Sequence, residues 1–144
     1  MELNLGYACI NLELREKGVY TGRTMIRRTF DSKGLPYVSE LALDNIRDLI
    51  EIIKWNHSKG IKVYRMSSSL FPWMSEFEFT DLPDYRKITI LLEGVGKLAK
   101  KYGQRLSFHP GQFCVLSSAT PDIVERSIEE FEYHADMARW MGFG

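Results

Sequence analysis

The sequence is poor in several features that would reveal a function at once. It has two cysteines, Cys9 and Cys114, and no C-x-x-C pair, which excludes a zinc finger. Both lie in or beside expected strands, so we expect them to be reduced, buried small side chains. The 19 Lys and Arg residues balance the 19 Asp and Glu residues, so no overall field attracts nucleic acid or a membrane surface. Any anion site must therefore come from a local cluster, such as Arg23, Arg27 and Arg28.

Long apolar runs are also missing. No stretch approaches the length of a membrane span, and the N-terminus lacks the basic start and apolar run of a signal peptide. We therefore expect an intracellular protein, cytoplasmic or, in a eukaryote, nuclear, with no membrane partner. The 144 residues, 44% of them hydrophobic, are enough for a single unit over residues 1–144 with its own core.

Hydrophobic periodicity predicts strands that alternate with helices. Strands are expected over residues 3–10, 61–66 and 105–108, with His109 at the end of the third. Helices are expected over residues 39–60, 84–103 and 120–141. Ser39 and Thr120 are the expected N-caps of the first and third helices. Residues 12–38 contain glycines and a proline without a sustained period, which predicts a long, partly ordered connection.

The order of these elements predicts the topology of the sheet. Strands and helices alternate with no tight hairpin signal, so the strands should be parallel with right-handed crossovers, which is an α/β fold of parallel β-α units. The carboxyl ends of such strands form one rim, where ligands bind. Asn11, residues 67–76 and residues 109–113 should share this rim. Three parallel strands leave two open edges, which suggests part of a larger domain or a dimer that completes the sheet.

The richest rim segment follows the third strand. His109 is followed by Pro110 and Gly111, which turn the chain. Neutral imidazole is a common metal ligand, although such a histidine can also bond within its own loop. Gln112 and Phe113 then offer an amide and a stacking face. This pair suits a nucleobase, or it packs within the loop.

Other rim residues have two interpretations each. Glu76, together with a histidine, suits Mn²⁺ or Mg²⁺, or it is a solvated acid. Arg65 and the serines behind it can hold a phosphate or form a structural cap on the strand. Tyr7 points into the core or, near the strand end, at a ligand. His57 and His134 lie within helices, and we expect structural roles for both.

Three separated motifs follow the three strands: LGYAC with Asn11 at residues 5–11, YRMSS with LFP at residues 64–72, and LSFHPGQF at residues 106–113. Their order and spacing resemble the N-terminal part of the ultraviolet damage endonucleases, repair nucleases that nick DNA on the 5′ side of pyrimidine photoproducts. Supporting matches are GRT at residues 22–24, DNIRDL at 44–49 and EYH at 132–134. The resemblance covers essentially all 144 residues.

The resemblance implies a TIM (β/α)8 barrel, of which this chain holds three N-terminal β-α units, with a cluster of divalent metals, usually manganese, at the rim. His109 would be a metal ligand in the catalytic centre. Gln112 and Phe113 would be pushed into the duplex at the lesion, and Tyr7 and Asn11 would line the same groove.

The implied partner is double-stranded DNA that contains UV photoproducts. The implied reaction is metal-assisted hydrolysis of the phosphodiester bond 5′ to the lesion. Arg23, with its neighbouring arginines, and Arg65 are then candidates for contacts with DNA phosphates.

This sequence departs from the family pattern at one rim position. After the LFP motif, family members typically have a serine and a metal-binding histidine, whereas here Ser75 is followed by Glu76. Glu76 either replaces that ligand or marks its loss. The family also draws histidines and carboxylates from later strands. Two alternatives therefore stay open: a sugar isomerase or epimerase of the metal-dependent barrel type, and a non-catalytic partial barrel.

Overall fold

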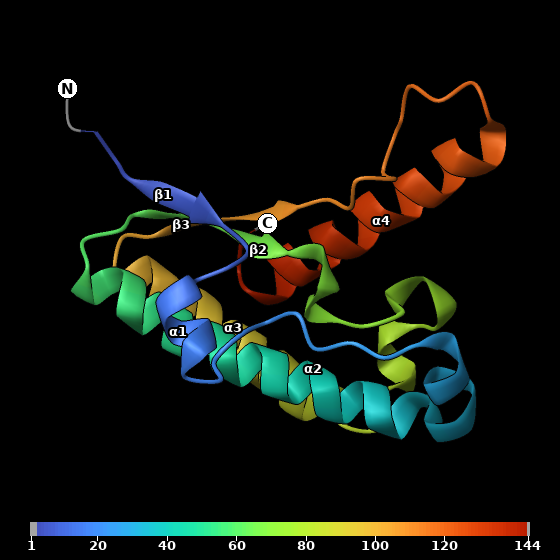
Figure 1. Cartoon of the computed structure of the whole chain (residues 1–144), viewed down its shortest axis with the longest axis horizontal. Coiled ribbons are helices and arrows are strands. Elements are labelled where there is room, and N and C mark those ends of the chain that lie inside the picture. Colours follow the sequence, from blue (N-terminus) through green and yellow to red (C-terminus); the bar gives the residue numbers. More distant parts are fainter. Residues whose placement is uncertain (1–2, 144) are drawn as a thin grey trace.

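The computed structural model describes residues 3–143 and contains a small parallel sheet backed by helices (Figure 1). The strands are β1 (Gly6–Ala8), β2 (Val63–Ser67) and β3 (Arg105–His109). They lie in the order β1-β2-β3, and both strand pairs are parallel. The helices are α1 (Leu12–Glu16), α2 (Arg27–Ser58), α3 (Tyr85–Lys101) and α4 (Pro121–Trp140). The predicted α/β class with parallel strands is confirmed.

The two faces of the sheet differ in what covers them. Tyr64 and Met66 of β2 are buried toward the helices, and Phe108 of β3 stacks on His134 of α4. Side chains alternate along a strand, so the intervening residues point the other way. On that face Arg65 and His109 are exposed, and we call it the uncovered face.

The core lies between the sheet and the helices α2 and α3, which run beneath it in Figure 1. Both helices bury one apolar stripe, as their periodicity predicts. The fully buried residues include Ile46, Leu49, Ile53, Ile88, Leu92 and Val95. The two helices therefore position the strand ends.

The prediction of a long connection over residues 12–38 was wrong, because two helices fall within it. Asn11 caps α1, and α2 already begins at Arg27. The helical pattern was hidden because Gly34 breaks α2 with φ 61° and ψ −157°, and Pro36 follows that kink. A glycine tolerates this conformation, so the chain bends there and resumes the helix.

The predicted N-cap at Ser39 was also wrong. Ser39 is buried inside α2, and its hydroxyl donates to the Asp84 carboxylate at 2.9 Å while accepting from the Asp84 amide at 3.2 Å. This pair ties the start of α3 to the middle of α2. Strand β1 is shorter than predicted, because Cys9 adopts the left-handed region with φ 57° and ends the strand.

Helix α4 begins where Thr120 and Pro121 predict and ends at Trp140. Its C-terminal end packs against α3 at Gly96, where a Cβ atom would overlap the carbonyl group of Met141. Its N-terminal half extends away from the sheet in Figure 1. Within residues 3–143, no helix combines the length and apolar character needed to cross a membrane.

Candidate nucleic-acid interface

The carboxyl ends of the three strands meet at one edge of the sheet. Ser67 of β2 pairs with His109 of β3, and the Cys9 amide donates to the Arg65 carbonyl at 2.8 Å. The loops after β1, β2 and β3 therefore start side by side. This confirms the predicted rim.

Residues 111–113, which we call the tip, project from this rim after β3. Phe113 is 82% exposed although it is a large aromatic side chain, and Gln112 is exposed beside it. His109, at the base of the tip, is exposed on the uncovered face, and its Nδ1 lies 3.1 Å from the Pro110 carbonyl. The histidine and the two tip side chains thus come from one short segment.

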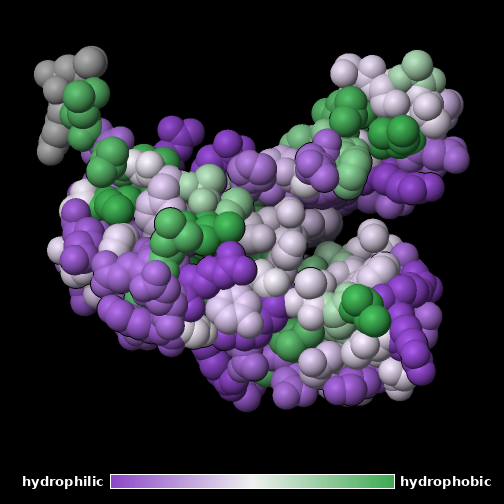
Figure 2. All heavy atoms as spheres, viewed as in Figure 1, coloured by the Kyte–Doolittle hydropathy of each residue, from purple (hydrophilic) through white to green (hydrophobic). Residues whose placement is uncertain are grey.

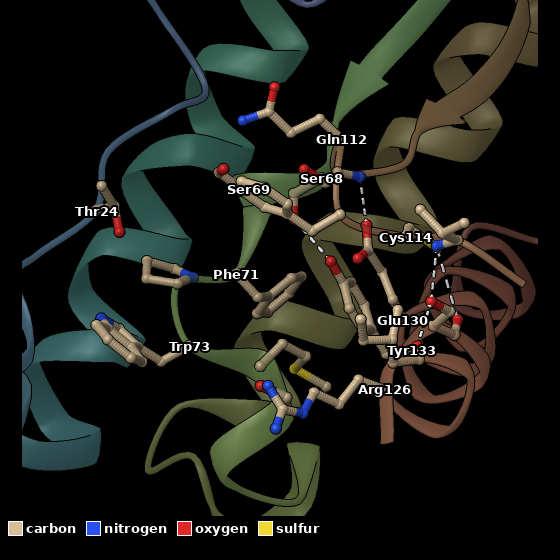
Figure 3. Close-up of a pocket in the computed structure, with 18 of the residues that line it drawn as sticks. Thr24, Ser68, Ser69, Phe71, Trp73, Gln112, Cys114, Arg126, Glu130 and Tyr133 are labelled. Atoms are coloured by element: carbon tan, nitrogen blue, oxygen red, sulfur yellow. Dashed lines mark hydrogen bonds between the residues drawn. The ribbon is translucent and has the colours of Figure 1, made fainter. Parts of the chain in front are cut away.

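Helix α4 holds the tip in place (Figure 3). The Gly111 amide donates to the Glu130 carboxylate at 2.5 Å. Two residues beyond the tip, the Val115 amide donates to the Ser127 hydroxyl at 2.8 Å, and that hydroxyl donates to the Ile123 carbonyl at 2.6 Å. An exposed loop with these side-chain tethers is pre-organised, so less ordering entropy is lost when it contacts a ligand.

The loop after β2 is fixed from two sides. Tyr133 of α4 donates its hydroxyl to the Ser68 carbonyl at 3.0 Å, and burial raises the pKa of Tyr133, which keeps the hydroxyl protonated. Trp73 donates its indole N–H to the Met25 carbonyl at 2.9 Å. Trp73 has φ 60°, so the chain turns sharply there.

A pocket of about 700 Å³ lies between the loop after β2, the tip and α4. Thr24 and Trp73 line one side, while Arg126 and Glu130 of α4 line the other (Figure 3). Figure 2 shows the corresponding hollow between the arm formed by α4 and the lobe beneath it. Phe113 lies among the lining residues, so the tip borders the pocket.

Tyr7 and Asn11 form a support beneath the rim. Asn11 donates to the Tyr7 hydroxyl at 2.9 Å, and that hydroxyl donates to the Asn56 side chain at 2.7 Å. The Asn11 side-chain carbonyl also caps α1 by accepting from the Leu14 amide at 2.9 Å. Burial raises the pKa of Tyr7. Of the two predicted orientations, Tyr7 therefore takes the one toward the helix layer, where its ring meets Trp55 edge to face.

Arg23 lies in a second support, which we call the Asn45 cluster (Arg23, Asn45 and Asp48). Its guanidinium contacts the Asp48 carboxylate at 2.7 Å, and its backbone amide donates to the Asn45 side-chain carbonyl at 3.0 Å. The Asn45 amide group donates to the carbonyls of Arg23, Ser69 and Leu70 at 3.1, 3.3 and 3.1 Å. The cluster thus joins the segment before α2 to the loop after β2.

A model of the family described as UV-endonuclease UvdE matches residues 3–144. The chain belongs to this family. A putative UV-damage endonuclease of Acanthamoeba polyphaga mimivirus is 39% identical over 142 residues, which are 98% of this chain and 43% of that protein. The UV-damage endonuclease of Schizosaccharomyces pombe is 38% identical over 135 residues, 92% of this chain and 22% of that protein.

A solved structure has the same fold over almost all of this UvdE-family chain. The crystal structure of SacUVDE superimposes with a TM-score of 0.81 and 29% sequence identity, covering 98% of this chain and 46% of that one. The chain therefore spans less than half the length of these relatives. The family resemblance predicted from the three strand-end motifs is confirmed.

The two predicted metal ligands of this UvdE-family chain have different surroundings. Glu76 contacts the Arg27 guanidinium at 3.1 Å, and Arg27 also lies over the rings of Phe30 and Trp73. His109 remains exposed and fits as a single imidazole ligand. Among residues 3–143, no three His, Cys, Asp or Glu side chains form a group that could hold a metal ion.

Arg65 and the cysteines complete the placement of the predicted residues. Arg65 is exposed on the uncovered face, where it pairs in register with Ala8 and Ser107. Cys9 and Cys114 are free but only half-buried, so they are less enclosed than predicted. Burial raises the pKa of both thiols.

Sequence reasoning missed the tethers of the tip. Ser127, Glu130 and Tyr133 recur every third residue of α4, which places them on one helix face. That spacing was a usable signal, because a polar stripe on a helix that follows a functional loop often faces the loop. The role of Asn45 had no comparable local signal.

Proposed function

We propose that this chain is the lesion-recognising part of a UV-damage DNA endonuclease, and that its sheet is the first part of a (β/α)8 barrel. Family membership and the similarity to nearly half of SacUVDE support this proposal. The parallel strands support it as well, because the uncovered face carries the alternate residues that would line a barrel interior.

The proposed substrate is double-stranded DNA that contains a UV photoproduct. The observation that carries the proposal is the exposed Gln112–Phe113 pair on a tip tethered to α4. Inserting Phe113 into a duplex costs unstacking energy of a few kcal/mol, which is least where a base is already damaged and poorly stacked. Stacking of the ring on a neighbouring base returns about 1–3 kcal/mol. Insertion is therefore selective for the lesion.

The proposed reaction of the whole enzyme is hydrolysis of the phosphodiester bond 5′ to the lesion with divalent metal ions, of which Mn²⁺ is the main candidate. Such ions polarise a phosphate and supply a hydroxide at neutral pH. In this chain His109 would hold one ion with its ring nitrogen. Glu76 would bind a metal ion only if its carboxylate leaves the Arg27 guanidinium. Arg65 on the uncovered face would contact the phosphate backbone of the DNA strand. Among residues 3–143 no three His, Cys, Asp or Glu side chains form a group that could hold a metal ion, so the proposed site needs further ligands.

The recognition step is tested by comparing the affinity of this chain for irradiated and intact duplexes of one sequence. We expect tighter binding to the irradiated duplex, and we expect Phe113→Ala to remove that preference. Phe131→Ala is the matched control, because Phe131 is an exposed phenylalanine on α4 outside the tip. Equal affinity of the wild-type chain for both duplexes would contradict the proposal.

The cutting step is tested separately by adding Mn²⁺ to the chain bound to irradiated DNA. With one exposed histidine at the rim and no three-ligand group among residues 3–143, we expect binding without nicking. Light scattering of the same sample determines whether two copies associate through the open sheet edges. Efficient nicking by a monomer would contradict the view that further ligands are needed.

A further inference from the structure

Positive charges gather at the end of the sheet opposite to the rim. Residues 52–75 contain four Lys or Arg residues and no Asp or Glu, and residues 94–121 contain four more, again with no acid. Four of these cations lie where α2 and α3 end and β2 and β3 begin, and we call them the amino-end patch: Lys59, Lys62, Lys101 and Arg105. These strand starts lie at the left of Figure 1, and Figure 2 shows many hydrophilic residues at that end.

Contacts between neighbouring elements bring the four cations onto one surface. The Arg105 amide donates to the Lys62 carbonyl at 2.7 Å, and the Lys62 ammonium donates to the carbonyl of Tyr102, the C-cap of α3, at 3.0 Å. The ring of His57, in the last turn of α2, stacks on the Tyr102 ring with 3.9 Å between the ring centroids. The ends of two helices and the starts of two strands therefore form one continuous basic surface.

The amino-end patch keeps a surplus of positive charge. Within residues 3–143 none of its four cations takes part in an ion pair. The hydrogen bond from Lys17, at 3.1 Å, is the main cause of the lowered pKa of Glu13, and Lys59 contributes least to it. Helix C-termini carry about half a negative elementary charge each, so the ends of α2 and α3 offset about one of the four positive charges. A surplus of about three remains to attract an anionic partner.

We propose that the amino-end patch binds the phosphate backbone of a second DNA segment while the rim contacts the first. This inference rests on the proposed function and extends it from one DNA contact to two. Strands β2 and β3 have five residues each, so about 16 Å separate their two ends. Charges at this distance are largely screened from each other, because the Debye length is about 8 Å at physiological ionic strength. The patch therefore adds little to binding at the rim and is available to another part of the same long polyanion.

The composition of the amino-end patch favours DNA over an acidic protein. Three of its four cations are lysines, which are depleted at the cores of protein interfaces. Lysine and arginine are the usual contacts to DNA phosphates, and these contacts need no particular base sequence. Binding of a second segment raises the effective concentration of DNA around the rim, so a chain that leaves one segment is already held at another.

The test is the capture of a second duplex. An irradiated duplex is immobilised and saturated with the chain, excess chain is washed away, and a labelled intact duplex is added. We expect the wild-type chain to capture the labelled duplex. In the patch variant, which combines Lys59→Gln, Lys101→Gln and Arg105→Gln, capture should fall at least about tenfold, and the slope of log affinity against log salt should become smaller by about 2 to 3. Lys62 is retained because its ammonium caps α3.

Two controls separate the amino-end patch from the rim and from overall charge. Binding of the patch variant to the immobilised irradiated duplex should stay within about twofold of the wild type, because the rim is screened from the patch. The matched charge control combines Arg47→Gln, Arg86→Gln and Lys87→Gln, which are exposed positions on α2 and α3 outside the patch, and it should capture the labelled duplex like the wild type. The pair Lys59→Gln and Lys101→Gln repeats the test if the patch variant does not fold.

Absence of capture by the wild-type chain, or equal capture by the patch variant, would overturn the inference. Equal capture is also the result expected if two chains associate and each uses its own rim. Capture of labelled polyglutamate as efficiently as the labelled duplex would assign the amino-end patch to an acidic protein and overturn the assignment to DNA. These outcomes leave the preference for irradiated DNA intact, whereas loss of that preference in the wild-type chain would overturn the proposed function itself.

Discussion

Asn45→Ala should destabilise the whole rim, because one buried amide side chain joins three segments of the chain. The side chain is fully buried and makes four hydrogen bonds of 3.0 to 3.3 Å, to the Arg23 amide and to the carbonyls of Arg23, Ser69 and Leu70. At about 1 kcal/mol for each of the three shorter bonds, the free energy of unfolding should fall by about 3 kcal/mol. For a chain of this size the melting temperature should then drop by roughly 6–12 °C.

Urea unfolding followed by tryptophan fluorescence measures this loss directly. Asn4→Ala is the matched control, because Asn4 is exposed and should change the free energy of unfolding by less than about 0.5 kcal/mol. The Asn45 variant should also bind irradiated DNA less tightly at temperatures where it is still folded, because Ser69 lines the pocket. A decrease of less than about 0.5 kcal/mol in the free energy of unfolding would refute the conclusion that Asn45 holds the segments of the rim together.

Three further outcomes follow from single contacts. Glu130→Gln weakens the tether of the tip, so affinity for irradiated DNA should fall several-fold while the melting temperature changes little, and an unchanged affinity would contradict the tether. Burial lowers the pKa of His134 to about 4, so between about pH 6.5 and 4 the unfolded chain takes up a proton that the folded chain does not. The free energy of unfolding should therefore fall as the pH drops from about 6.5 towards 4, by at most about 1.4 kcal/mol per pH unit. His134→Phe should remove this part of the pH dependence in denaturant titrations. Gly96→Ala should lower the free energy of unfolding by about 1–3 kcal/mol in thermal melts, because the added Cβ meets the Met141 carbonyl. Gly94→Ala on the same helix is the control: its Cβ would point into open space, so the variant should be as stable as the wild type or more stable.

The elements that pack by periodicity were predictable from the sequence. Strands β2 and β3 and helices α3 and α4 lie close to their predicted ranges, because each buries a simple apolar pattern against the core. The exposed tip was predictable for a different reason: an aromatic residue after a proline and a glycine has no local partner to cover it.

The missed features depend on partners far away in the sequence. Ser39 has the composition of a helix cap, but its hydroxyl meets Asp84, 45 residues later. Arg23 belongs to a cationic cluster in the sequence, yet its guanidinium contacts Asp48 in the folded chain. Glu76 is a candidate metal ligand in the sequence, yet its carboxylate contacts the Arg27 guanidinium in the folded chain. Local charge patterns do not contain this information.

The tethers between the tip and α4 have a consequence for how such enzymes can be divided. The parts that present Phe113, namely the Gly111 amide, Glu130 and Ser127, all lie within residues 105–134. Under the proposed function, finding a distorted site and breaking the strand there would be separable tasks in one enzyme. We would then expect a segment of this kind to keep its recognition surface when it is joined to a different catalytic unit or marks a lesion for another protein.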